Sequence, residues 1–275
     1  MELGREDYTE PRCPFETDQW KSEPPVRSIP VSRIIEKLDE LYSRNDFDAA
    51  VRLIDYWMEE AKAGRDLKGE FSLRNELMGI YRKTGKRTEA VENARLCIDL
   101  VEKMDARGSI SEGTALVNAA TVCKAFGRPE ESLALFRRAR EIYEANLKPG
   151  DWRLGGLYNN MGLTLADLGR FAEARMLFNK ALSSMAQVEG SQAEQAVTCL
   201  NMADLACAEK GLEAAEQEIA ELCAKAAELL ESEELPRDGQ YAFYCEKCAP
   251  VFSYYGFFMD GEKFSERARQ IYERP

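Results

Sequence analysis

The sequence predicts an all-α protein built of about six helical hairpins that follow one another along the chain. Gly85, Gly127, Gly169 and Gly211 recur with a step of 42 residues, and Gly256 follows 45 residues later. Each glycine lies in a short polar stretch between two segments with helical apolar periodicity. Because glycine readily adopts the left-handed backbone that ends helices, each one predicts a turn between two helices.

The first three hairpins turn near residues 45, 85 and 127. Asn45 lies 40 residues before Gly85, and asparagine is the next-best residue for a left-handed position. The second and third hairpins share small and large residues at matching offsets, which predicts close helix packing with the large side chains filling the gaps. These residues are Leu77, Met78, Tyr81, Ala90, Ala94 and Cys97 in the second hairpin, and Leu116, Ala119, Ala120, Cys123, Ser132, Phe136 and Ala139 in the third.

The last three hairpins turn near residues 169, 211 and 256. The fourth carries Tyr158-x-x-Met161-Gly162-x-x-Leu165, followed by Ala174, Phe178 and Ala181. The fifth lacks one turn residue, so Ala215 and Ile219 take the places of the alanine and phenylalanine. The sixth contains Pro250 inside its first helix, which we expect to kink or break that helix.

This pattern resembles the tetratricopeptide repeat, and the resemblance covers about residues 31–273. The period of 42 residues, against about 34 in the usual repeat, is similar to the longer kinesin-light-chain type. The resemblance implies a right-handed α-solenoid of about six repeats over residues 31–275 and a non-enzymatic scaffold for protein–protein interaction. Residues 1–30 are polar and rich in proline, so we expect them to be disordered or to form an N-terminal cap.

Asparagines recur on the first helices of the repeats. Asn75, Asn159 and Asn201 lie ten residues before their turn glycines, and Asn118 and Asn160 lie nine before theirs. The resemblance implies that these positions face a concave groove, where an asparagine amide can bind the main chain of an extended peptide. The alternative is that they bond to a neighbouring repeat and hold the array together. Other candidates for the groove, at the same face, are Arg82, Lys83, Thr121, Lys124, Leu163 and Leu205.

Composition excludes several classes of function. The chain has 37 basic and 49 acidic side chains, a net charge of −12 and no histidine. The negative charge argues against nucleic-acid binding, and the lack of histidine excludes histidine-based catalysis and metal sites. No apolar run approaches the roughly 20 residues that a membrane helix needs, and no signal peptide is visible. We therefore expect a cytoplasmic protein without membrane contact, metal or cofactor.

The eight cysteines are expected to be reduced. Cys245 and Cys248 form a CxxC pair, but a zinc site needs four ligands and the chain has no second pair. We expect both to be buried as small apolar residues, like Cys97, Cys123, Cys199, Cys207 and Cys223. Cys13 lies outside the repeats and is expected to be the most exposed thiol.

The sequence predicts a non-enzymatic scaffold that binds a peptide or protein segment in the groove of the array. Two alternatives remain open: a peptide-sensing regulator that acts on a separate effector chain, and a structural protein that self-associates. The structural alternative rests on an apolar stripe of the last expected helix, 258–273, which no further repeat covers. The stripe consists of Phe258, Phe264, Ala268, Ile271 and Tyr272. If this stripe stays open, it favours a homodimer through repeat six.

Overall fold

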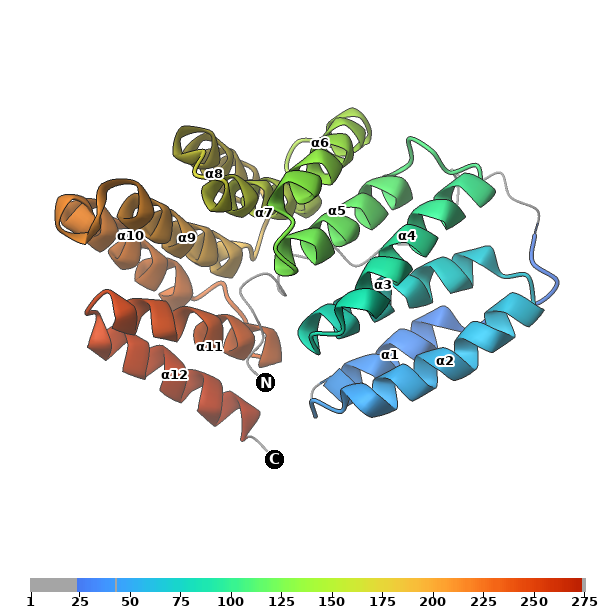
Figure 1. The fold of residues 1–275 in the computed structure, drawn as a ribbon. Helices are drawn as coiled ribbons and strands as arrows, with labels where there is room; N and C mark the ends of the chain where they lie inside the picture. The colour runs from blue at the N-terminus through green and yellow to red at the C-terminus, as the bar shows by residue number, and fades with distance from the viewer. Residues whose placement is uncertain (1–23, 43, 274–275) are drawn as a thin grey trace. The chain divides into compact units, whose positions relative to one another are not determined.

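The structure is a computed structural model that describes residues 24–42 and 44–273. The described residues form twelve helices and no strand, and consecutive helices pair as six hairpins (Figure 1). This confirms the predicted all-α class and the number of hairpins.

The chain divides into two compact units of three hairpins each. In the N-terminal unit, the described residues end at Asn146, and the helices are α1 Val31–Tyr42, α2 Phe47–Ala63, α3 Leu67–Lys83, α4 Arg87–Lys103, α5 Ile110–Ala125 and α6 Pro129–Asn146. In the C-terminal unit, which begins at Leu147, they are α7 Trp152–Asp167, α8 Phe171–Met185, α9 Gln192–Lys210, α10 Leu212–Glu231, α11 Gly239–Tyr254 and α12 Phe258–Tyr272.

The turns inside the hairpins share one hydrogen-bond pattern. Gly85, Gly127, Gly169 and Gly256 follow their first helices with positive φ, and Asn45 does the same at φ 53°. The residue that follows each of these five positions donates its backbone N–H to the carbonyl five residues earlier in the helix, as Lys86 does to Tyr81 at 2.8 Å. This is the Schellman arrangement that the glycines predicted.

Repeat five departs from this pattern, as the missing residue predicted. Only Gly211 separates α9 from α10, and its backbone lies at φ 81° and ψ 158° instead of the left-handed helical region. Its N–H donates to the Cys207 carbonyl at 2.9 Å. The chain therefore reverses direction at a single residue.

Small residues allow the paired helices to approach closely. A Cβ added to Gly162 would lie 2.7 Å from Cε1 of Phe178, and one added to Gly113 would lie 2.4 Å from Cε1 of Tyr143. Phe178 and Tyr143 are fully buried in return. The alternation of small and large residues predicted from the sequence is thus the packing between the two helices of a hairpin.

The structure corrects one expectation about repeat six, the helix break at Pro250, and answers the open question about the stripe on its last helix. Helix α11 continues through Pro250, so the proline does not break it. Pro250 and Glu246, whose carbonyl loses the usual helical bond to the proline, are both exposed residues. The stripe on α12 is also not left open as a whole, because Phe264 and Ala268 are buried against repeat six while Phe258 and Tyr272 stay exposed.

Among the described residues, no helix is both long and apolar enough to span a bilayer.

Candidate functional site

Two pairs of asparagines form the core of the candidate site, one pair in each unit. In the N-terminal unit, Asn118 Nδ2 donates to Asn75 Oδ1 at 2.9 Å. In the C-terminal unit, Asn201 Nδ2 donates to Asn159 Oδ1 at 3.0 Å. In both pairs the later repeat donates to the earlier one, so the recurrence in the sequence is a recurrence of contacts between first helices.

The N-terminal pair is joined to the helix behind it. Asn75 Nδ2 donates to the Phe71 carbonyl at 2.9 Å and approaches Cys97 Sγ of α4 at 3.3 Å. Asn75 thus connects α3, α4 and α5. Asn118 is 4% exposed, and its Oδ1 has no hydrogen-bond partner although it is buried. One acceptor of this pair is therefore unused.

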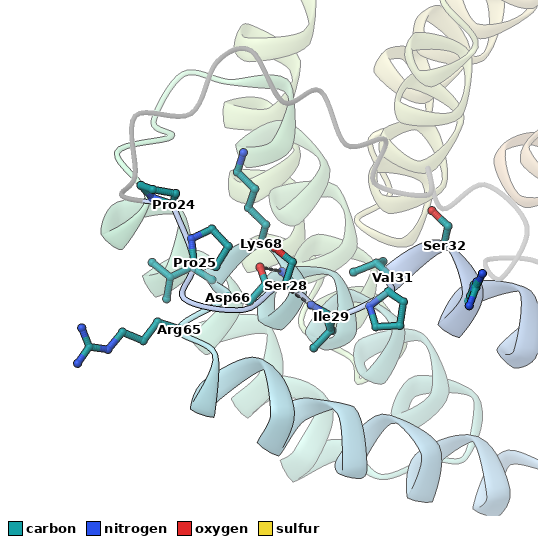
Figure 2. A pocket seen from close by; sticks show the side chains of 13 residues that line it. Pro24, Pro25, Ser28, Ile29, Val31, Ser32, Arg65, Asp66 and Lys68 are labelled. Carbon is teal, nitrogen blue, oxygen red and sulfur yellow. Dashed lines mark hydrogen bonds between the residues drawn. The ribbon is translucent and has the colours of Figure 1, made fainter.

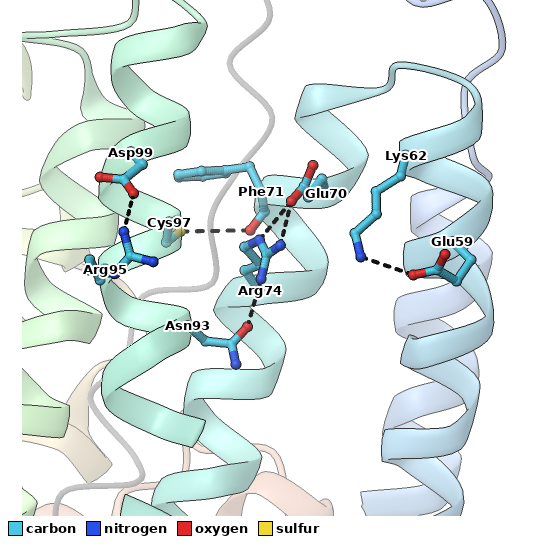
Figure 3. A network of polar contacts seen from close by, with 9 residues as sticks. All are labelled: Glu59, Lys62, Glu70, Phe71, Arg74, Asn93, Arg95, Cys97 and Asp99. Carbon is cyan, nitrogen blue, oxygen red and sulfur yellow. Dashed lines mark hydrogen bonds and ion pairs between the residues drawn. The ribbon is translucent and has the colours of Figure 1, made fainter. Parts of the chain in front are cut away.

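A second set of polar contacts fixes α3 against α4 nearby. Arg74 Nε donates to Glu70 Oε1 at 2.9 Å, and Arg74 Nη1 donates to Asn93 Oδ1 at 3.1 Å. Figure 3 shows Arg74 between these two partners, with Phe71 and Cys97 close by. Arg74 and Glu70 are mostly buried, and their ion pair lies within α3. The bond from Arg74 to Asn93 is the one that joins this helix, which carries Asn75, to α4.

The C-terminal pair is centred on Asn159. Its Oδ1 accepts from Asn201 Nδ2 and also from Thr198 Oγ1, at 3.2 Å. Asn159 is 1% exposed, and its Nδ2 is buried without a hydrogen-bond partner. The acceptor side of this amide is saturated and the donor side is unused, the reverse of Asn118.

The other predicted site residues are spread over both units. Thr121 Oγ1 bonds to the Val117 carbonyl of its own helix at 2.9 Å. Lys83 is half-buried, and its Nζ lies 5.7 Å from the centroid of the Tyr42 ring. Arg82, Thr121, Asn160 and Leu205 are buried, whereas Lys124 and Leu163 are half-buried. Arg82 is therefore not the solvated surface charge that its place near the turn first suggests.

Comparison with known proteins identifies the repeats. A family model for the tetratricopeptide repeat matches residues 70–145, and a second tetratricopeptide-repeat model matches residues 155–192. Residues 70–145 and 155–192 are tetratricopeptide repeats. The first match includes both Asn75 and Asn118, whereas the second includes Asn159 and ends before Asn201.

The similar proteins agree on the type of repeat. Over 202 residues, 71% of the chain, it is 26% identical to Protein KINESIN LIGHT CHAIN-RELATED 3 of Arabidopsis thaliana. It spans 30% of the length of that relative. A solved structure of kinesin-light-chain TPR-like repeats from Podosopora anserina matches with 16% identity and a TM-score of 0.52, over 72% of this chain and 92% of that one. These likenesses support a tetratricopeptide-repeat protein of the kinesin-light-chain type.

The solved structure of Rap protein is also similar in fold. Rap protein, solved in complex with competence and sporulation factor, matches with 14% identity and a TM-score of 0.54, over 86% of this chain and 73% of that one. At this identity the likeness concerns the fold alone. The tetratricopeptide-repeat fold implies a scaffold for interaction with other proteins.

A pocket that sequence reasoning missed lies at the start of the array. The segment 24–30 crosses the turn between α2 and α3, where Asp66 Oδ2 accepts from Ile29 N–H at 2.8 Å and Oδ1 accepts from Gly69 N–H at 3.0 Å. Figure 2 shows Asp66 beside Ser28 and Ile29. The pocket, of about 760 Å³, is lined by residues 24–25, 28–33 and 65–69. Asp66 precedes a helix, which was the available signal, because aspartate is a favoured N-cap.

Six of the seven described thiols are buried, as predicted, but Cys207, which was also expected to be buried, is half-buried. None of the seven is in a disulfide, and Cys13 lies outside the described residues. Burial raises the pKa of the Cys199 thiol to about 11, and burial together with nearby Asp260 raises that of Cys223 to about 11. Within the described residues, no group of cysteines and carboxylates converges as a metal site.

Proposed function

We propose that this tetratricopeptide-repeat protein is a non-enzymatic scaffold that binds an extended segment of a partner protein through the asparagine pairs. The observation that carries the proposal is the unused hydrogen-bonding capacity at both pairs. Asn118 Oδ1 is an acceptor and Asn159 Nδ2 is a donor, and each is buried without a partner. In each unit an extended peptide segment can supply the missing partner, because its N–H groups complement Asn118 Oδ1 and its C=O groups complement Asn159 Nδ2.

The cost of an unsatisfied buried polar group supports this reading. Leaving such an atom without a partner costs about 1–3 kcal/mol, which a ligand that supplies the partner recovers. Asn75 and the acceptor side of Asn159 serve the array itself. Both roles considered for the asparagines can therefore apply, each to different atoms. The bonded atoms hold neighbouring repeats together, and Asn118 Oδ1 and Asn159 Nδ2 are the atoms proposed to bind a ligand.

The burial of these side chains also predicts the kinetics of binding. Asn118 and Asn159 are 4% and 1% exposed, so a peptide reaches them only after the groups that cover them move. Association that requires such a change is slower than docking on an open surface. We expect association rate constants below the usual range of about 10⁵–10⁷ M⁻¹s⁻¹.

The experiment is a selection from a library of random 12-residue peptides against the full chain, followed by binding measurements on variants. Asn118→Ala and Asn159→Ala are each expected to weaken the selected peptides about tenfold. Asn146→Ala is the control, because that asparagine, at the end of α6, is exposed and donates to the backbone carbonyls of Gly108 and Ile142. Backbone N-methylation of the peptides should abolish binding at one or two positions. Peptides that bind the folded Asn118→Ala and Asn159→Ala variants as tightly as the wild type would refute the proposal.

A further inference from the structure

The turn of repeat six carries an exposed apolar cluster. Tyr254, at the end of α11, is 74% exposed, and Phe258 and Met259, at the start of α12, are 69% and 87% exposed. We refer to these three residues as the aromatic turn. Three large apolar side chains in six residues of open surface are unusual for a polar loop, and such clusters mark interaction surfaces.

The fold of repeat six does not require these side chains. The core of the hairpin is completed by Phe252 and Phe264, whose ring centroids lie 5.4 Å apart and which are both fully buried. The corresponding positions in repeat two are Lys83, Arg87 and Thr88. The same turn geometry therefore forms with polar residues, and the apolar character of the aromatic turn calls for another explanation.

The neighbouring helix α10 is strongly acidic. Residues 212–234 contain eight acidic side chains and one basic side chain, Lys225. Glu218 and Glu231 form ion pairs within the unit, as in Lys263 Nζ to Glu231 Oε1 at 2.8 Å. The others lie exposed, and four of them recur along α10 to form what we call the acidic face: Glu213, Glu216, Glu221 and Glu228.

Contacts between α10 and α12 place the aromatic turn beside this helix. Glu231 accepts from Lys263 and from Arg267, both on α12, and Asp260 at the start of α12 acts on the Cys223 thiol in the middle of α10. Phe258 and Met259 directly precede Asp260. The start of α12, which carries Phe258 and Met259, thus lies alongside α10, the helix that carries the acidic face.

We propose that the aromatic turn and the acidic face together dock a basic amphipathic segment of a partner protein, with its apolar side on Phe258 and Met259 and its lysines or arginines toward α10. A second copy of this chain is the poorer occupant. Residues 147–275 carry 21 acidic and 13 basic side chains, so two such surfaces repel each other. The proposed surface includes none of the paired asparagines and does not depend on the function proposed for them.

The test uses a labelled 16-residue peptide of leucine, tryptophan and lysine, patterned as an amphipathic helix, and a scrambled peptide of the same composition. Binding to the full chain is followed by fluorescence anisotropy. The patterned peptide is expected to bind at least fivefold more tightly than the scrambled one, and Phe258→Ser with Met259→Ser is expected to remove that advantage. Met176→Ser is the matched control, since Met176 is 71% exposed on α8.

Charge is tested separately. Glu213→Gln with Glu216→Gln should weaken the patterned peptide at least threefold, and added salt should weaken binding to the wild type more than to this variant. Circular dichroism confirms that each variant is folded. Equal binding of the two peptides, or equal losses in the Met176→Ser control, would overturn the proposal. So would a dimer in light scattering that Phe258→Ser dissociates, because a second copy would then be the occupant.

Discussion

Asn159 is the residue whose role the structure changes most. An asparagine that only faced a ligand would affect binding and leave stability unchanged. Asn159 Oδ1 instead accepts two bonds, from Thr198 and Asn201, across the boundary between repeats four and five. We expect Asn159→Ala to lower the free energy of unfolding by about 1–3 kcal/mol, since Asn201 Nδ2 loses its partner in a buried position. Urea unfolding measures this change.

A double-mutant cycle isolates the asparagine pair from other effects of the substitution. The double variant should lose less free energy of unfolding than the sum of the losses in Asn159→Ala and Asn201→Ala. The reason is that Asn159→Ala already leaves Asn201 Nδ2 without its partner, so removing Asn201 as well costs less. Strict additivity would contradict the bond as the source of the loss. The same cycle with Asn75 and Asn118 tests the N-terminal pair.

The thiols are predicted to differ in reactivity. With their pKa values raised to about 11, Cys199 and Cys223 carry about one thiolate in a thousand at pH 8, and burial restricts access further. In a Cys13→Ser variant, we expect a disulfide reagent to modify half-buried Cys207 first and the six buried thiols only after unfolding. Mass mapping of the labelled peptides checks this order. Labelling of Cys199 as fast as Cys207 in the folded chain would contradict it.

At the scale of the element, Gly211 and Gly169 form a matched pair. A Cβ at either glycine meets nothing within 4 Å, so only the backbone distinguishes them. Gly169 lies at φ 68°, in the region that asparagine tolerates and that Asn45 occupies in repeat one. Gly211, at φ 81° and ψ 158°, lies in a region essentially restricted to glycine.

Substitution by asparagine should therefore destabilise the protein more at Gly211 than at Gly169. Gly211→Asn is expected to lower the free energy of unfolding by about 1–3 kcal/mol, whereas Gly169→Asn should change it by less than about 1 kcal/mol. Urea midpoints of the two variants measure the difference. An equal loss at both positions would show that the single-residue turn of repeat five carries no special strain.

The hairpins were predictable because their signals are local. A glycine with positive φ and the small–large alternation around it act within one hairpin, and Gly85, Gly127 and Gly169 all end first helices. Of the kink or break expected at Pro250, the break was wrong, because α11 continues through that residue. The proline removes a single backbone N–H, while side chains on both sides of it, such as Cys248 and Phe252, are buried in the hairpin, and this packing is not a local signal.

At the scale of the whole molecule, the candidate site was predictable only in part. The register of the asparagines was visible in the sequence, but their bonds depend on how one hairpin is rotated against the next. Thr198 also donates to Asn159 Oδ1, but its position in the repeat does not distinguish it from the other polar residues of α9. The contact between Asp66 and Ile29 joins residues 37 positions apart and leaves no periodic signal.

The division into two units predicts that stability is local. In an array of repeats each hairpin contacts mainly its neighbours, so a cavity in one unit should leave the distant hairpins unchanged. Phe264→Ala removes a fully buried ring that packs on Phe252 in repeat six, a change that costs about 3–5 kcal/mol. We expect amide hydrogen exchange to accelerate in α9–α12 and to stay unchanged in α1–α4. Phe71→Ala, at an equally buried ring of α3, should give the reverse pattern. Mass spectrometry of both variants after the same labelling times measures the two patterns side by side. If either substitution accelerates exchange by the same factor in all twelve helices, the chain unfolds as one cooperative body, and the nearest-neighbour description is wrong.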